Sequence, residues 1–241
     1  MCSIFGCLNY NNNFFSLEEF IKSNKLMTNR GPDYSDVKEY IIGNKVLRFG
    51  FNRLSILDLS NNGNQPMISS CNRYSIIFNG EIYNHLNLRK DAKLLNHIWK
   101  GTSDTETLIA LFQYYDLETI LHKLEGMFAF CVFDIKEKKL FIARDRCGEK
   151  PIYISTGNNY FAFSSDLISI QDLPFFDKKI SENALKSYFT YNYILNPHSI
   201  YQNTYKVPPS SYLTLDLNKI EFNESNSFED FINNKNIVFK K

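Results

Sequence analysis

The sequence predicts a protein of the α+β class. Segments with strand character follow one another in runs, and the chain lacks the regular strand–helix–strand alternation that builds parallel sheets. The pattern is clearest at 127–134 and 139–146, two strands joined by a short Lys/Glu turn, which indicates an antiparallel hairpin. Both strands are apolar on both faces, so we expect helices to cover one side of this sheet and a second sheet the other.

The first part of the chain is rich in strands. Ile, Val, Phe and Tyr are concentrated in four segments, and one further segment has apolar residues at helical spacing. Arg30-Gly31-Pro32-Asp33 is predicted to be a loop, because Gly-Pro interrupts both helices and ladders. Turn-forming residues fill 61–66. We expect a helix at 16–28 and strands at 3–9, 38–43, 46–52 and 74–79.

The second part begins with helices. Ser103-Asp104-Thr105-Glu106 has the S-x-x-E form of a capping box, and apolar residues continue the predicted helix through Phe112. From residue 218 the composition changes to Asn, Lys and Glu, which predicts a linker or loosely ordered tail over 218–241. Further helices are expected at 117–124 and 181–191, and further strands at 151–155, 160–164 and 211–217.

Composition and charge exclude several functional classes. The chain has 241 residues, 44% of them hydrophobic, which is enough for one large domain or two small ones. The 27 basic and 26 acidic residues leave a net charge of +1, so we expect neither a nucleic-acid partner nor a membrane partner. Neither a transmembrane run nor a signal peptide is present. A cytoplasmic protein with a small-molecule substrate is the expectation.

The cysteines do not suggest disulfides or a metal site. There are five, at spacings that match no zinc pattern, and a reducing compartment would keep them free. The four histidines form no ligand cluster in the sequence, so no metal is expected. Free cysteines commonly pack as small apolar residues. Cys2 is the exception, because it lies at the tip of a predicted buried strand.

Cys2 follows Met1 directly, at a chain end that would ordinarily be poorly ordered. Removal of Met1 would place a thiol and a free α-amine on one residue. Their reference pKa values, about 8.5 and about 7.7–8.0, are close enough for the amine to accept the thiol proton near neutral pH. N-terminal nucleophiles are activated in this way. The alternative is a buried cysteine that only packs.

The stretch "FNGEIYN" at 78–84 also has two interpretations. Asn79-Gly80 after an apolar strand is a strong turn signal. It is equally suited to an oxyanion hole, in which a side-chain amide and a following backbone N–H stabilise a tetrahedral oxyanion. Gly80 would allow the backbone to approach a substrate closely.

Seven motifs occur in one order: "MCSIFG", "RGPD", "RLSILDL", "FNGEIYN", "SDTETLIAL", "LEGMFAF" and "RDRCGEKPIY". Through them the chain resembles the N-terminal class II glutamine amidotransferase domain of glutamine-hydrolysing asparagine synthetases, a match that extends through "VPPSSYLTLDL". The resemblance implies that residues 1–217 form this domain. It also implies an Ntn-hydrolase fold, a four-layer αββα sandwich of two antiparallel sheets.

The resemblance assigns the chemistry of the site. Cys2 would attack the side-chain amide of L-glutamine, release ammonia and form a glutamyl thioester that water hydrolyses. The Asn79 side chain and the Gly80 backbone would form the oxyanion hole. Arg30 and Asp33 of "RGPD" would order the loop over the nucleophile.

The resemblance also assigns recognition of the free amino acid. Arg53 would hold the α-carboxylate, in keeping with bidentate pairing of a guanidinium with a carboxylate. Ile56 would offer backbone contacts. Glu81 and Asp104 would hold the α-ammonium, although an acid at the first position of a helix is also favoured by the helix dipole.

The resemblance has a limit. The S-G-G-x-D-S loop that marks the ATP-dependent synthetase domain of these enzymes is absent from the 241 residues. This chain would therefore need no cofactor, and ATP and Mg²⁺ would belong to a synthetase that uses the ammonia to amidate aspartate. Two alternatives stay open, a truncated and idle glutamine-binding or interaction module, and a glutaminase subunit that serves another acceptor. With a synthetase partner, the surface near "RDRCGEKP" (144–151) and 183–210 should be more apolar than a monomer needs.

Overall fold

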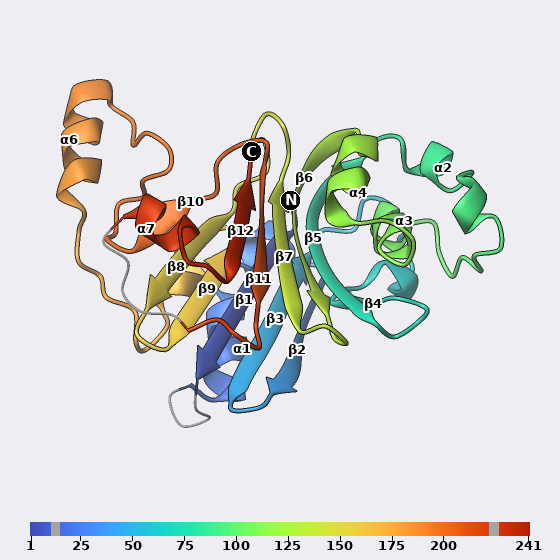
Figure 1. Cartoon of the computed structure of the whole chain (residues 1–241), viewed down its shortest axis with the longest axis horizontal. Helices are drawn as coiled ribbons and strands as arrows, with labels where there is room; N and C mark the ends of the chain where they lie inside the picture. Colours follow the sequence, from blue (N-terminus) through green and yellow to red (C-terminus); the bar gives the residue numbers. More distant parts are fainter. Residues whose placement is uncertain (11–14, 222–226) are drawn as a thin grey trace.

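The computed structural model describes residues 1–10, 15–221 and 227–241, and two six-stranded sheets form its centre (Figure 1). Every pair of neighbouring strands is antiparallel. The first sheet has the order β10 (Thr204–Lys206), β8 (Tyr153–Gly157), β9 (Tyr160–Ser164), β1 (Ser3–Tyr10), β3 (Lys45–Arg53), β2 (Tyr34–Ile42). The second has the order β12 (Ile237–Lys240), β11 (Ser211–Asp216), β7 (Lys139–Arg144), β6 (Gly126–Asp134), β5 (Tyr74–Ile82), β4 (Met67–Ile68).

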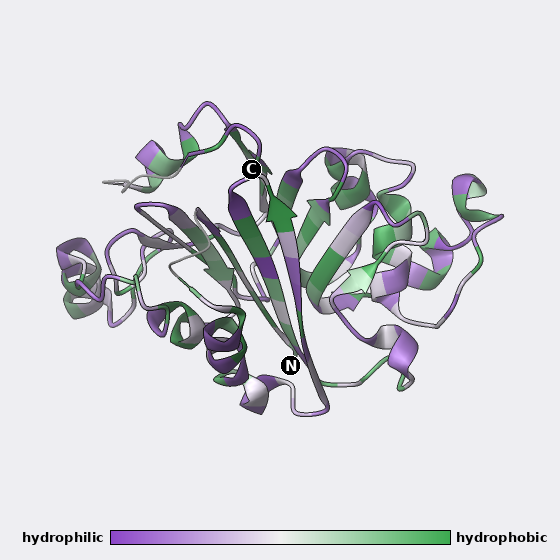
Figure 2. Ribbon diagram, turned by 90° about the horizontal axis from the view of Figure 1, so that it is seen from below, coloured by the Kyte–Doolittle hydropathy of each residue, from purple (hydrophilic) through white to green (hydrophobic). Residues whose placement is uncertain are grey.

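Helices cover the outer faces of both sheets (Figure 2). Helices α1 (Leu17–Lys25) and α5 (Leu167–Gln171) pack on the first sheet, and α3 (Asp104–Leu111) and α4 (Leu117–Lys123) pack on the second. A third apolar cluster fills the space between the sheets. The predicted α+β class and the four-layer αββα sandwich are therefore confirmed.

Alternation along the strands explains the three apolar layers. In β1, Ile4 and Leu8 face the second sheet, whereas Phe5 and Cys7 face the helices. Phe5 stacks on Phe20 of α1 with ring centroids 4.6 Å apart. Each such buried side chain contributes roughly 1.5–3 kcal/mol to the free energy of unfolding. A strand buried on both faces must be apolar throughout, which is why β1 and β6 read as continuous hydrophobic runs.

Most predicted elements are present with shifted ends. The helix predicted at 16–28 ends at Lys25, and the strand predicted at 38–43 begins at Tyr34. Before residue 218, some short elements were not predicted, because each has too few residues to show a clear period; they include α2 (His85–Leu88), α5, β4 and β10. In the described ranges, none of the helices is long and apolar enough to span a membrane.

Strand β5 extends beyond the predicted 74–79. Its ladder with β6 continues through Ile82, so the turn interpretation of Asn79-Gly80 is wrong. Glycine is needed at this position of the strand because β6 approaches closely. A Cβ on Gly80 would lie 2.2 Å from the carbonyl oxygen of Met127.

Helix α3 begins as predicted, but its cap has a different form. Ser103 Oγ accepts a hydrogen bond from the backbone nitrogen of Glu106 at 3.2 Å. The Glu106 carboxylate does not return to Ser103. It accepts instead from the nitrogens of Lys100 and Gly101, at 2.7 and 2.9 Å, and thereby fixes the segment before the helix.

The C-terminal segment is not the loosely ordered tail that its composition predicted. Residues 222–226 lie outside the described ranges, but the segment that follows them is part of the fold. Helix α7 (Phe228–Ile232) buries Phe228 and Phe231 in the core between the sheets, and β12 pairs with β11. A few apolar residues at the right spacing are enough to order this segment, although its average composition is polar.

Candidate active site

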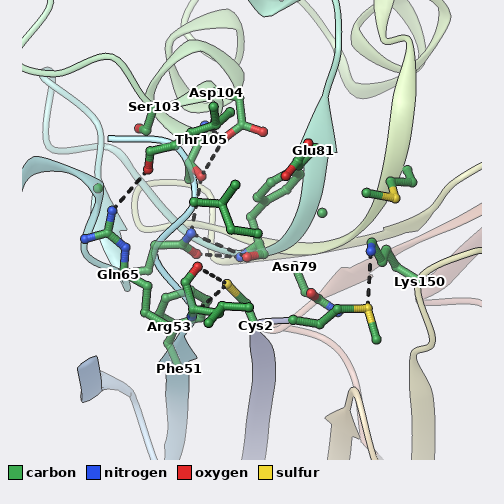
Figure 3. Close-up of a pocket in the computed structure, with 18 residues that line it drawn as sticks. Cys2, Phe51, Arg53, Gln65, Asn79, Glu81, Ser103, Asp104, Thr105 and Lys150 are labelled. Atoms are coloured by element: carbon green, nitrogen blue, oxygen red, sulfur yellow. Dashed lines mark hydrogen bonds between the residues drawn. The ribbon is translucent and has the colours of Figure 1, made fainter. Parts of the chain in front are cut away.

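A pocket lies where the two sheets meet at one end, and Figure 3 shows its lining. Antiparallel pairing of Ser3 with Asn52 brings the start of β1 beside the end of β3, and both strands pack across β5. The fold therefore brings these three distant stretches of sequence together, and the start of α3 adds a fourth. All seven residues predicted to be catalytic or substrate-binding line this one pocket: Cys2, Arg53, Ile56, Asn79, Gly80, Glu81 and Asp104.

Cys2 is half-buried at the edge of the core between the sheets. Its Sγ lies 3.4 Å from the backbone nitrogen of Leu54 and 3.5 Å from the carbonyl oxygen of Leu54. Burial raises the pKa of the thiol, and this effect exceeds the lowering by the Leu54 N–H, the chain's terminal ammonium and Arg53. The thiol is therefore protonated at neutral pH and needs a base before it can act as a nucleophile.

Asn79 presents an unused hydrogen-bond donor to the pocket. Its side chain is on the face of β5 that meets the first sheet, as is that of Ile77 two residues earlier. The residue is only 1% exposed, and its Nδ2 has no hydrogen-bond partner among the described residues. Buried donors are nearly always paired, so an unpaired one in a pocket suggests a ligand.

The Gly80 N–H points into the same space. The backbone N–H groups of Phe78 and Ile82 point away from β6, because Phe78 donates to Gln65 Oε1 at 2.6 Å and Ile82 donates to Asp104 Oδ2 at 2.9 Å. Alternation places the Gly80 N–H between them on the same side. This side of β5 is open there, because β4 pairs only with residues 75 and 76. Asn79 and Gly80 thus offer two donors to one pocket.

Arg53 is buried in the wall of the pocket. Its Nη1 donates to Ser60 O at 2.9 Å and Asn64 Oδ1 at 2.8 Å, and its Nη2 donates to the carbonyl oxygens of Leu57 and Asp58. Residues 57–64, called here the 57–64 loop, therefore fold around the guanidinium. Arg53 brings positive charge to the pocket and holds this loop in place.

Two carboxyl groups lie on the opposite side of the pocket from the Cys2 sulfur (Figure 3). Asp104 is the first residue of α3, and its two oxygens accept from the backbone nitrogens of Ile82 and Thr105 at 2.9 and 2.8 Å. Burial raises the pKa of Asp104 to about 6, to which the charge of Glu81 adds, while the two hydrogen bonds act in the opposite direction. A buried acid beside a partly buried one is suited to bind a cation.

Arg30 and Asp33 lie beside the pocket rather than in it. Arg30 Nε is 3.4 Å from the carbonyl oxygen of Cys2, and Asp33 Oδ2 accepts from the backbone nitrogen of Ser55 at 2.7 Å. Gly31 lies so close to β3 that a Cβ would be 2.3 Å from the Asn52 carbonyl oxygen. The "RGPD" loop is thus packed against the backbone of both strands that carry the site.

Sequence reasoning missed the place of Gln65 and Lys150 in the pocket. Gln65 was assigned only turn chemistry, but its buried amide binds the Phe78 nitrogen and donates to Thr105 Oγ1 at 3.2 Å. Lys150 is buried, and its Nζ lies 3.3 Å from the sulfur of Met1. Neither role has a local signal, because both depend on contacts between distant segments. Across the described ranges, no group of three His, Cys, Asp or Glu side chains could hold a metal ion.

Comparisons with known proteins show the family of this chain. A family model described as a glutamine amidotransferase domain matches residues 1–227. The chain is 36% identical over 237 residues to a Methanocaldococcus jannaschii protein whose name is that of a glutamine-hydrolysing asparagine synthetase, and 36% identical over 199 residues to asparagine synthetase [glutamine-hydrolyzing] 1 of Bacillus subtilis. These matches cover 92% and 82% of this chain but 45% and 30% of the relatives, so the chain spans less than half their length.

The fold also has solved counterparts. Glutamine phosphoribosylpyrophosphate amidotransferase from Bacillus subtilis superposes with a TM-score of 0.64 at 13% identity, over all of this chain and 49% of that one. A structure described as the allosteric regulatory enzyme of purine biosynthesis superposes with a TM-score of 0.63 at 15% identity, over 94% of this chain and 49% of its own length. At such identities the likeness concerns the fold alone.

Proposed function

This chain belongs to the family of glutamine amidotransferase domains, and we propose that it hydrolyses L-glutamine to glutamate and ammonia through a thioester on Cys2. One observation carries the proposal. The thiol of Cys2, the unpartnered Nδ2 of Asn79 and the open N–H side of Gly80 line the same pocket. A nucleophile and two oxyanion donors are the parts that acyl transfer requires.

The mechanism begins with removal of Met1, which exposes the α-amine of Cys2. The amine takes the thiol proton, and the sulfur attacks the side-chain carbonyl carbon of glutamine. Asn79 and Gly80 stabilise the oxyanion of the tetrahedral intermediate, a contribution of about 3–4 kcal/mol for one such donor. Collapse of the intermediate breaks the C–N bond, and the ammonium that holds the proton returns it to the leaving ammonia. Water, deprotonated by the same amine, then hydrolyses the thioester to glutamate.

Both charged ends of free glutamine find a complement in the pocket. Glu81 and Asp104 place negative charge at the side opposite the sulfur, where the α-ammonium would bind. Arg53 supplies positive charge for the α-carboxylate, and Ile56, which is 60% exposed, lies at the rim. A pocket that binds both charged α-groups selects a free amino acid over a glutamine residue within a protein, because the α-groups of that residue are part of neutral amides.

We further propose that the ammonia passes to an ATP-dependent synthetase that amidates aspartate, and that ATP and Mg²⁺ bind there. The names of the relatives support this acceptor, and the relatives are long enough to hold such a part. The surface agrees, because helix α6 (Glu182–Tyr191) buries only Ala184. Large apolar side chains that are exposed on and after α6 are Leu185, Tyr188, Phe189, Tyr191, Tyr193 and Leu195.

The alternative of a binding module without turnover depends on whether Met1 is retained. Met1 itself lines the pocket, with its sulfur against Lys150. A chain that retained Met1 would lack the free amine on Cys2 and would have a narrower pocket. Glutamine binding without hydrolysis is expected of that form.

The test uses mass spectrometry of the purified protein together with an assay of glutamate release. Loss of Met1, glutamate release and its abolition in Cys2→Ala would support the proposal. Retained Met1 with glutamine binding but no release would establish the binding module instead. Addition of ATP, Mg²⁺, aspartate and a candidate synthetase chain tests the acceptor, since asparagine should then form from glutamine.

A further inference from the structure

We propose that Asp58 is a positioning residue. It fixes the side of the pocket that carries Arg53, called here the Arg53 side, relative to the side that carries Asp104, called here the Asp104 side. These two sides are the ones proposed to bind the charged groups of glutamine. The inference rests on the proposed glutaminase function and deepens it. Asp58 does not line the pocket, so it acts through these two residues rather than on the substrate.

The backbone of Asp58 is hydrogen-bonded to Arg53. Its carbonyl oxygen accepts from Arg53 Nη2, as does that of Leu57 at 3.3 Å. Its Oδ1 accepts from the backbone nitrogen of Ser60 at 3.1 Å, which closes the 57–64 loop on itself. The position of the guanidinium and the conformation of this residue are thereby linked.

The side chain of Asp58 reaches the Asp104 side. Its Oδ2 accepts a hydrogen bond from the backbone nitrogen of Thr102 at 2.6 Å, two residues before Asp104. The contact is close, since a Cβ on Gly101 would lie 2.1 Å from Asp58 Oδ2. A second link runs parallel to it, from Asn62 Nδ2 to the carbonyl oxygen of Lys100 at 2.8 Å.

Residues 101–103, the segment to which Asp58 is hydrogen-bonded, are also fixed by Arg89. The guanidinium of Arg89 donates to the carbonyl oxygens of Gly101 and Ser103 at 2.9 and 2.8 Å. Arg89 also packs over the ring of Trp99, 4.0 Å from its centroid. A movement of the 57–64 loop relative to Asp104 must therefore break the link at Thr102.

Asp58 has properties suited to this task. Its φ of +52° is in the left-handed region, which Asp and Asn tolerate better than most residues. Burial acts to raise the pKa of Asp58, but hydrogen bonds from Ser60 and Thr102 and the charge of Arg53 bring it below its ordinary value. The group is ionised at neutral pH, and hydrogen bonds to a carboxylate are stronger than those between neutral groups.

Asp58→Asn tests the inference. Asparagine accepts the same backbone conformation, but its single amide oxygen cannot serve both Ser60 and Thr102. We expect the KM for glutamine to rise roughly tenfold or more, the effect of one charged hydrogen bond, with a smaller change in kcat and a modest fall in melting temperature. Asp177→Asn is the matched control, because Asp177 accepts the nitrogen of Lys179 at 3.0 Å outside the pocket.

A double-mutant cycle with Asp104→Asn separates positioning from a merely structural role. If Asp58 acts through Asp104, the two substitutions together should raise KM by less than the product of their separate effects. Independent, multiplicative effects or an unchanged KM in Asp58→Asn would overturn the inference. Should Asp58→Asn fail to fold, Asn62→Ala breaks the parallel link and should raise KM several-fold, by loss of one neutral hydrogen bond; an unchanged KM there is again contrary.

The wild-type assay keeps the two proposals apart. A wild-type chain without Met1 that releases no glutamate contradicts the proposed function itself. An active wild-type chain with an unaltered Asp58→Asn variant contradicts only the positioning role.

Discussion

Asp104 accepts a hydrogen bond from the backbone nitrogen of Ile82 at 2.9 Å. The carboxylate proposed to bind the substrate ammonium is thereby attached to β5, two residues beyond the proposed oxyanion donor Gly80. The distance between the ammonium site and the reacting amide is thus set by one strand and one helix terminus. Sites built on regular elements hold their groups more precisely than sites on loops.

The oxyanion donor can be tested directly. Asn79→Ala should lower kcat by roughly 10²–10³, as for loss of one oxyanion donor, and should change KM little. The melting temperature should fall only modestly, because Asn79 Nδ2 makes no hydrogen bond within the described protein. Asn9→Ala, at the other end of β1 from Cys2 and also buried, is the control. An equal loss of activity in both variants would indicate disruption of the fold instead.

The pH dependence of glutamine binding should follow Asp104. Its pKa of about 6 means that the group loses its charge as the pH falls below that value, so the KM for glutamine should rise there. In Asp104→Asn the KM should be high and nearly independent of pH between about 5 and 8, a range that lies around the shifted value. Steady-state kinetics across this range measure it, and an unchanged pH profile in the variant would assign the effect elsewhere.

The same shift has the opposite sign for stability. The pKa of Asp104 in the folded chain is above its ordinary value of 3.8, so protonation favours folding. The contribution of Asp104 to the free energy of unfolding should be fully present below pH 3.8 and lost as the pH rises through 6. As the pH rises through about 6, the affinity for glutamine therefore increases while this contribution to the free energy of unfolding is lost.

Gly80 is expected to accept no side chain. In Gly80→Ala the new Cβ would lie 2.2 Å from the carbonyl oxygen of Met127, so β5 and β6 must separate. We expect a loss of about 1–3 kcal/mol in the free energy of unfolding, typical of overpacking, together with loss of glutamate release. Denaturant unfolding measures this loss, and an unchanged free energy of unfolding in Gly80→Ala would argue against a steric cause.

The C-terminal segment should contribute to global stability. Phe231 is 2% exposed and stacks on Phe161 with centroids 5.9 Å apart. Phe231→Ala should lower the free energy of unfolding by about 3–5 kcal/mol. Val238→Ala, at a side chain that is 51% exposed, should change it by less than about 0.5 kcal/mol. Equal stability of the two variants would mean that the segment after residue 226 is not part of the cooperative fold.

Local patterns were enough to predict much of the fold. The hairpin of β6 and β7, the strands around Cys2 and Arg53, and the start of α3 at Ser103 all follow from the order of apolar and polar residues. Several elements of two to five residues, such as β4 and α5, were missed, because so few residues show no clear period. The order of strands in each sheet was not predicted, since hydrophobic pattern alone does not select partners.

The sequence by itself determined which chemical groups this protein brings to its site: a thiol behind Met1, an Asn-Gly pair, an arginine and two acids, in motifs that can be read in order. Only the tertiary structure decided that Asn79 lies within a strand with a free donor, that Gln65 supports it, and that Asp58 links the Arg53 and Asp104 sides. These roles are hydrogen bonds and unpaired donors between segments far apart in the chain. They form only when the two sheets have packed together, so no local sequence pattern predicts them.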